Sequence, residues 1–257
     1  MIKKNYLSRE EQRIWEYIRD KETVDTELVK AIFPEFSSHK INQLLHNLAK
    51  KDYLHRARRN LYYNPATITD FHQLALQIHP GYIAFSSALR YYHLLEYEDF
   101  TIFIITRSFR KKMDLPGTQY TLEYLPFGKL YSGYEKKDNI YISTLEKTLF
   151  DCLKKPNLLG FSVITKAFYE TKNINWPLFL SFFKMIKTPA LYQRTGYLLE
   201  LLQKETKKKI PQEVFHFFLS KVRNPIKLSA GRGPTKYNAK WKIQDNLGTE
   251  KIIGWWY

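Results

Sequence analysis

An amphipathic helix signal near the start of the chain is the feature that most constrains its fold. Four apolar residues have the i, i+3, i+4, i+7 spacing of a buried helical stripe, and Ser37-Ser38 before them can supply an N-cap. They are Ile41, Leu44, Leu45 and Leu48. The residues between them include no acid: His39, Lys40, Asn42, Gln43, His46, Asn47 and Lys50. This pattern predicts a helix with one face in a core and an outer face that suits base edges or phosphates.

Two shorter helices are expected before this one. Ser8 and Glu11 have capping-box spacing, and Asp25 can cap a second helix that Pro34 must end. Their apolar positions are Ile14, Trp15 and Ile18 in the first, and Leu28, Val29 and Ile32 in the second. The order is therefore helix, short turn, helix, followed by the amphipathic helix.

A β-hairpin signal follows the third helix. A first strand is expected at 53–56, a short turn at 57–60 and a second strand at 61–63, with the sequence HRARRN at 55–60 and Pro65 closing the segment. Asn60 suits a hairpin tip because asparagine tolerates positive φ. Three helices and a hairpin predict a winged helix-turn-helix domain over residues 1–65, with the rest of the chain, 66–257, as a second domain.

In a winged helix the third helix enters the major groove of duplex DNA and the hairpin lies over the adjacent backbone. The expected helix contacts are Ser38, His39, Lys40, Asn42, Gln43 and Asn47, and the expected phosphate contacts are Arg56, Arg58 and Arg59. Some winged helices bind proteins instead, and those usually carry a mixed-charge or apolar third-helix face. The acid-free face favours DNA.

The charge distribution agrees with a polyanionic partner. The net charge is +16, and it is concentrated in two segments. Residues 37–64 have six Lys and Arg against one acid, and residues 201–257 have twelve against four. Lysines kept only for solubility would be spread evenly, whereas clustered ones attract polyanions.

The sequence argues for a folded cytoplasmic protein without a membrane partner. Hydrophobic residues make up 44% of the chain, and no stretch approaches the roughly 20 uninterrupted apolar residues of a membrane helix. The N-terminus leads into a polar helix signal without the apolar region of a secretory peptide. Cys152, the single cysteine, has apolar neighbours and is expected to be a buried thiol.

Residues 66–257 predict an α+β domain with a small sheet over about 82–142, a helical bundle over about 144–222 and a basic segment at 223–257. Strands are expected at 82–85, 101–106, 120–125 and 140–142, with a turn at 133–139. Helices are expected at 69–78, after Ser86 or Ser87, and from Thr144, where Ser143 and Glu146 have capping-box spacing.

Three segments, in order, resemble the AbiEi family of antitoxins from type IV toxin-antitoxin, or abortive infection, systems. They are Tyr82-Ile83-Ala84-Phe85-Ser86-Ser87-Ala88-Leu89 with His93-Leu94, Ser143-Thr144-Leu145-Glu146-Lys147-Thr148-Leu149-Phe150-Asp151-Cys152-Leu153, and Arg194-Thr195-Gly196-Tyr197-Leu198-Leu199-Glu200. The resemblance implies a repressor of its own operon that recognises inverted repeats in double-stranded DNA. It also implies that the second domain counteracts a nucleotidyltransferase toxin, in phage defence. Asn60 stands where relatives often have glycine, and the family pattern does not account for Trp255-Trp256-Tyr257.

No enzymatic activity, cofactor or metal is expected. Glu146, Lys147 and Asp151 could suggest an active site, but capping and an i, i+4 pair on a helix surface explain them. A nuclease is the weaker alternative: Asp114 and Glu135 could supply carboxylates, but Glu135 lies in the expected turn at 133–139, where metal chemistry would need a rigid strand.

The second basic region remains open at this stage. Its candidate antitoxin surface consists of Arg194, Lys207, Lys208, Lys209 and Arg223. Arg194 could bond neighbouring carbonyls or Asp151, and Gly196 indicates close approach of another backbone. The cations could be solvated helix ends, a second DNA-backbone surface, or a surface that faces RNA.

Overall fold

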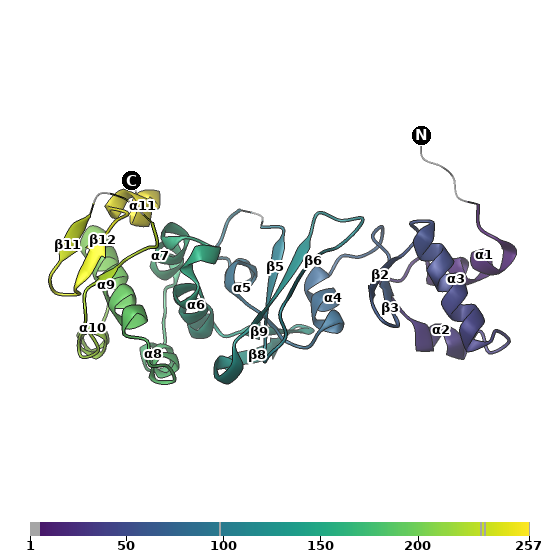
Figure 1. Ribbon diagram of the computed structural model, residues 1–257, viewed down its shortest axis with the longest axis horizontal. Helices are drawn as coiled ribbons and strands as arrows, with labels where there is room; N and C mark the ends of the chain where they lie inside the picture. The colour runs from purple at the N-terminus through teal and green to yellow at the C-terminus, as the bar shows by residue number, and fades with distance from the viewer. Residues whose placement is uncertain (1–5, 98, 232, 234, 257) are drawn as a thin grey trace. The chain divides into compact units, whose positions relative to one another are not determined.

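The computed structural model describes residues 6–97, 99–231, 233 and 235–256, and it divides the chain into two compact units. The first contains the chain up to Gly81 together with Phe100–Leu125, and the second contains Tyr82–Asp99 and everything from Pro126 onward. Each unit mixes helices and strands, so the predicted α+β class is confirmed (Figure 1). The domain boundary expected at 65/66 lies inside the first unit and stays a prediction.

Three helices open the first unit: α1 (Arg9–Ile18), α2 (Thr26–Ile32) and α3 (Ser38–Lys50). The three predicted caps are confirmed, because the side chains of Ser8, Asp25 and Ser37 each accept a backbone hydrogen bond from the first turn that follows. The predicted α3 stripe is buried, at 0 to 3% exposure, against Ile14, Ile18 and Val29. Leu28 is 46% exposed, so its predicted place on the buried face of α2 is wrong.

A small sheet completes this part of the first unit. Strands β1 (Thr23–Asp25), β2 (His55–Arg58) and β3 (Leu61–Tyr63) have the order β1-β3-β2. Figure 1 labels β2 and β3. The predicted hairpin is confirmed, and Asn60 at its tip has φ 61°, as expected. Its bounds differ from those expected, because the first strand covers His55–Arg58 instead of 53–56 and the turn has two residues instead of four. Strand β1 was not expected, because three residues carry too little periodicity to predict a strand.

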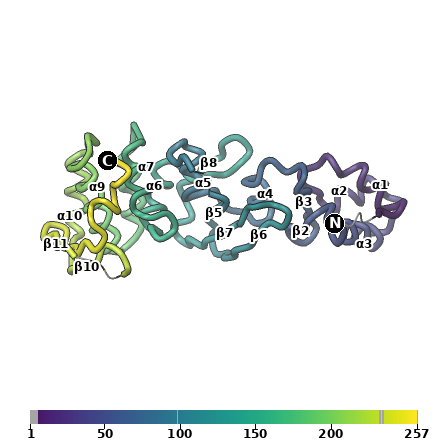
Figure 2. Tube along the Cα trace, turned by 90° about the horizontal axis from the view of Figure 1, so that it is seen from above, coloured from purple at the N-terminus to yellow at the C-terminus, as the bar shows by residue number. Residues whose placement is uncertain are grey.

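The remainder of the first unit is a helix and a second sheet: α4 (Phe71–Ile78), β5 (Thr101–Thr106), β6 (Lys111–Asp114) and β7 (Thr121–Pro126). Figure 2 shows the neighbouring strands β5, β7 and β6, whose order is β6-β7-β5. The Tyr124 hydroxyl donates a 2.8 Å hydrogen bond to the carbonyl of Ala75, which fixes the sheet to α4.

In the second unit, strands β4 (Tyr82–Ile83), β8 (Tyr134–Lys137) and β9 (Ile140–Ser143) have the order β4-β9-β8. Three expectations are wrong here. The strand expected at 82–85 ends at Ile83. Residues 134–137 form a strand paired with β9 where a turn was expected, and α5 (Phe85–Tyr91) begins without a side-chain cap, so Ser86 and Ser87 lie within the helix. The alternation that marks a half-buried strand is missing from the exposed β8 sequence.

The helices of the second unit follow: α6 (Leu145–Lys154), α7 (Phe161–Glu170), α8 (Trp176–Lys184), α9 (Pro189–Glu205), α10 (Gln212–Leu219) and α11 (Thr249–Ile253). Short 3-10 helices lie at Gly128–Leu130, Pro156–Leu158 and Gly254–Trp256. A third sheet contains β10 (Ile226–Lys227), β11 (Lys236–Asn238) and β12 (Ile243–Asp245). Within the described parts of the chain, no helix combines the length and apolarity needed to cross a membrane.

Candidate functional site

The exposed face of α3 is set by the residues that α3 buries. Because Ile41, Leu44, Leu45 and Leu48 point into the core, the helical period turns the intervening positions outward. The exposed residues are Ser38, His39, Asn42, Gln43, His46 and Lys50. The described residues give no hydrogen-bond partner to the side chains of Asn42, Gln43 or His46, so their polar groups are available for a ligand.

Lys40 and Asn47, two other predicted contacts, face α1 instead. The Lys40 ammonium lies 2.6 Å from a Glu10 carboxylate oxygen. Asn47 hydrogen-bonds to Glu11. Burial raises the pKa of Glu11, but hydrogen bonds from Lys51, the Ser8 backbone and Asn47 outweigh burial and hold the pKa below its ordinary value. Both side chains thus already have acidic partners.

The hairpin and α3 enclose a small hollow of about 270 Å³. Its described lining contains no carboxylate and consists of Thr26, Asn42, His46, Arg56, Arg59, Asn60 and Tyr62. In the hairpin, Arg56 pairs with Tyr62 and Arg58 pairs with Leu61, so the register shifts between these two pairs. Arg59 and Asn60 form the two-residue turn at the tip. The fold therefore brings two guanidinium groups next to the free amide of Asn42 and imidazole of His46.

Arg58 does not line this hollow. Its Nε donates a 3.0 Å hydrogen bond to the carbonyl of Gln77, at the end of α4, and its Nη1 donates one of 3.0 Å to the carbonyl of Arg59. The bond to Gln77 attaches the hairpin to α4, and the bond to Arg59 lies within the hairpin. Of the three predicted phosphate contacts, Arg56 and Arg59 line the hollow, whereas Arg58 donates to two carbonyls. Arg56 Nε also donates one longer bond, of 3.4 Å, to the carbonyl of Arg58.

Four lining residues were missing from the predicted contacts: Thr26, His46, Asn60, which was expected only as the hairpin tip, and Tyr62. The sequence could have indicated His46, because the helical spacing places it on the same exposed face of α3 as Asn42 and Gln43. Thr26 reaches the hollow only because β1 pairs with β3, with Asp25 opposite Leu61. Nothing in the local sequence indicates that pairing.

The candidate cations of the second unit separate into two groups. Arg194 donates hydrogen bonds of 3.4 and 3.2 Å to the carbonyl of Lys227, and Lys208 donates to the carbonyls of Tyr169 and Thr171 at the end of α7. Burial lowers the pKa of both. Lys207, Lys209 and Arg223 are exposed. Arg194 and Lys208 are thus structural donors, and the other three are accessible.

The Lys147–Asp151 pair is buried in full, so the prediction of a helix-surface pair is wrong. Lys147 donates to Asp151 and, over 3.0 Å, to the Tyr82 hydroxyl. Its ammonium lies 5.1 to 5.9 Å from the ring centroids of Tyr82, Phe127, Phe150 and Phe182. Burial lowers the pKa of Lys147 and raises that of Asp151 to about 6.

The predicted Ser143–Glu146 capping box is also wrong. Thr144 caps α6 by accepting from the backbone of Lys147, and a Glu146 carboxylate oxygen accepts a 2.9 Å hydrogen bond from the Asn175 backbone. Ser143 instead hydrogen-bonds to Thr148 over 2.7 Å. Cys152 is buried, as predicted.

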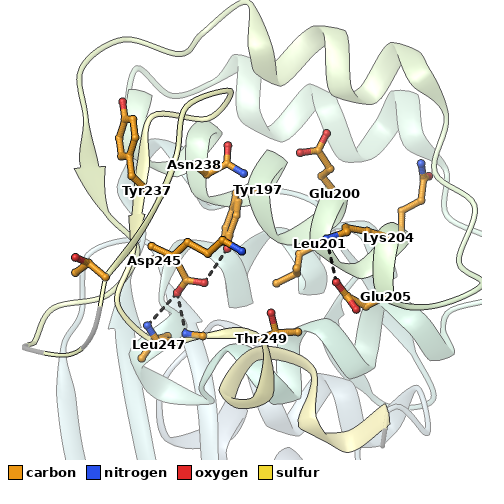
Figure 3. A pocket seen from close by; sticks show the side chains of 14 residues that line it. Tyr197, Glu200, Leu201, Lys204, Glu205, Tyr237, Asn238, Asp245, Leu247 and Thr249 are labelled. Atoms are coloured by element: carbon orange, nitrogen blue, oxygen red, sulfur yellow. Dashed lines mark hydrogen bonds and ion pairs between the residues drawn. The ribbon is translucent and has the colours of Figure 1, made fainter.

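A larger hollow of about 760 Å³ lies between α9 and the β11–β12 segment (Figure 3). Asp245 points into it but accepts hydrogen bonds from the Tyr197 hydroxyl and the backbones of Leu247 and Gly248. Glu200 accepts from Lys240 and from the Trp241 indole. Since these carboxylates already have partners within the fold, this hollow is a weaker candidate than the one at α3.

Glu135 stands on strand β8, so the turn argument against a nuclease does not hold. Its carboxylate forms a 2.8 Å ion pair with Lys137. Across the described residues, no group of three or more His, Cys, Asp or Glu side chains could hold a metal ion.

Neither a protein-family model nor a curated protein matches the sequence. The chain is similar in structure to the RV2827C protein from Mycobacterium tuberculosis, known from its crystal structure. The TM-score is 0.65, and the match covers 94% of this chain and 93% of that one, at 13% sequence identity. At this identity the similarity shows a shared α+β fold.

Proposed function

We propose that the chain is a non-enzymatic DNA-binding transcriptional regulator whose first 65 residues form a winged helix-turn-helix. In this proposal α3 is the recognition helix and the β2–β3 hairpin is the wing. The observation that carries it is the acid-free hollow, where Asn42 and His46 of α3 meet Arg56 and Arg59 of the hairpin. Amide and imidazole groups suit base edges, and guanidinium groups suit phosphates.

The residues divide into two expected roles. Asn42, Gln43 and His46 have free side chains on the exposed face, with Ser38 and His39 one turn earlier, and they are assigned to bases. Arg56 and Arg59 are assigned to phosphates. The three other predicted contacts bind partners within the protein, so they are assigned to holding α3 and the hairpin in place. They are Lys40, Asn47 and Arg58.

The resemblance to AbiEi antitoxins supports a more specific proposal. The chain would repress its own toxin-antitoxin operon through inverted repeats in the promoter, and the second unit would counteract a nucleotidyltransferase toxin. Co-expression with a nucleotidyltransferase encoded next to this chain tests the antitoxin role, because the chain should restore growth. Continued growth arrest would contradict it.

Titration of the full chain with fluorescent promoter duplex, and with a shuffled duplex as the control, tests DNA binding. Asn42→Ala should cost about 1–3 kcal/mol on the promoter duplex and little on the shuffled one. Arg59→Ala should weaken both and reduce the slope of log affinity against log salt by about 0.9. Arg58→Ala is the matched control, with a smaller change in slope.

Equal affinity for both duplexes would contradict sequence recognition, and an unchanged salt slope for Arg59→Ala would contradict the wing assignment. A protein-interaction module is the competing class. Such a module would still bind the toxin after Asn42, Arg56 and Arg59 are replaced. It would also bind the promoter duplex no more tightly than the shuffled one.

A further inference from the structure

A second basic hollow lies in the second unit, apart from the residues assigned to duplex DNA. Its volume is about 550 Å³, within the roughly 300–1,000 Å³ range of small-ligand pockets. Its lining residues lie at or just after the end of α8, at the start of α9, and at or just after the end of α10. Figure 1 labels these three helices. The wall is apolar and aromatic, made by Ile186, Pro189, Tyr192 and Phe217.

The remaining lining residues are all cations: Lys184, Lys187, Lys221 and Arg223. All four are exposed, and none has an ion-pair partner among the described residues. No carboxylate belongs to the described lining. Like charges around one concavity repel each other, and a bound anion with several negative charges relieves that repulsion.

The aromatic wall restricts the class of anion. The Tyr192 hydroxyl oxygen lies 2.7 and 2.9 Å from the carbonyl oxygens of Phe183 and Ile186, which share its one proton, and this fixes the ring. The half-buried Phe217 ring packs against it with a centroid distance of 5.9 Å. A fixed aromatic surface beside cations is the combination that stacks an unpaired base and holds its phosphate. Inorganic phosphate would gain nothing from the rings, and the bases of a duplex are already stacked on each other.

We propose that this hollow binds a nucleotide, with its base against Phe217 and its phosphates on Lys187, Arg223 and the neighbouring lysines. The nucleotide is either free or part of a single strand, and both present the same chemistry. Nucleotide binding at this hollow and duplex binding by the first unit are separate proposals. An experiment can therefore contradict one of them while the other stands.

The test measures binding of ATP and of a fluorescent single-stranded oligoadenylate to the full chain. The double variant Lys187→Gln/Arg223→Gln should weaken binding by about tenfold or more, and Phe217→Leu by about tenfold, the size of one lost stacking contact. Lys207→Gln/Lys209→Gln is the matched control. It removes the same charge from exposed lysines outside the hollow and should change binding by less than about threefold.

Tighter binding of the oligonucleotide than of ATP would assign the hollow to single strands, and equal or tighter binding of ATP would assign it to free nucleotides. An equal loss in the control pair would overturn the proposal, because general charge would then explain the binding. Inorganic triphosphate competing as well as ATP, or a duplex binding as tightly as the single strand, would overturn base recognition. The charge variants keep the test valid if Phe217→Leu fails to fold, and an unchanged urea unfolding transition shows that they are intact.

Discussion

At the residue scale, small details of side-chain packing decide what each polar or small residue does. Gly196 lies in α9, where the sequence indicated close approach of another backbone. Its neighbour is the indole of Trp241 instead, which is completely buried against the helix. A methyl group at position 196 would overlap that ring.

Gly196→Ala should destabilise the protein by about 1–3 kcal/mol, because the indole must move out of its site. The free energy of unfolding in urea measures this. Gly254→Ala is the control, since its added carbon would lie 3.8 Å from Glu250 Cγ, and it should change stability by no more than about 0.5 kcal/mol. A similar loss in both variants would contradict the packing explanation.

Lys147→Met should cost about 3 kcal/mol, because it leaves a fully buried carboxylate without its cation. The double variant Lys147→Met/Asp151→Leu should recover most of that loss, since it removes both charges and keeps apolar volume. Urea unfolding of the two variants provides the comparison. Equal destabilisation would mean that packing around Lys147, rather than its charge, is what matters.

At the element scale, short segments take their conformation from the elements they connect. The β2–β3 hairpin has a two-residue turn, and its second residue, Asn60, adopts a positive φ. The carbonyl of Asn60 also accepts a 3.0 Å hydrogen bond from the Thr26 backbone, which connects the hairpin to the start of α2. The position of the proposed wing therefore depends on one turn residue.

Asn60→Gly should leave stability within about 0.5 kcal/mol, whereas Asn60→Val should cost more than about 1 kcal/mol, because a β-branched residue is strained at positive φ. Thermal unfolding measures stability, and promoter binding reports the wing geometry. The valine variant should lose affinity for promoter and shuffled duplexes alike. Full DNA affinity in that variant would show that the turn does not position the arginines.

At the scale of the whole molecule, charge and burial control how stability responds to pH. Burial raises the pKa of Asp151 from an ordinary 3.8 to about 6, so the folded chain holds this proton more tightly than the unfolded chain. The stabilisation that results is complete below the ordinary pKa. It is lost as the pH rises through about 6.

The stability of the wild type relative to Asp151→Asn should therefore fall by up to about 3 kcal/mol between about pH 4 and pH 7. Urea unfolding of both proteins across this range checks the prediction, and other carboxylates cancel in the difference. A difference that stays constant or rises with pH would mean that the Asp151 pKa is not raised.

The N-terminal helices and the hairpin were predictable because their signals are local. A capping side chain bonds within one turn, an apolar stripe repeats with the helical period, and a tip asparagine adopts positive φ by itself. Residues close in sequence indicate the α3 stripe, the caps at Ser8 and Ser37 and the turn at Asn60, all of which the structure contains. The α+β class follows from the same signals.

The tertiary structure alone decided which of those side chains are free. Glu10 and Glu11 of α1 engage Lys40 and Asn47, the end of α4 engages Arg58, and strand β1 brings Thr26 to the hollow. The burial of Lys147 with Asp151, and the basic hollow between α8, α9 and α10, likewise depend on contacts between distant segments. A local pattern specifies which face of a helix is polar, but long-range packing determines which polar groups already have a partner.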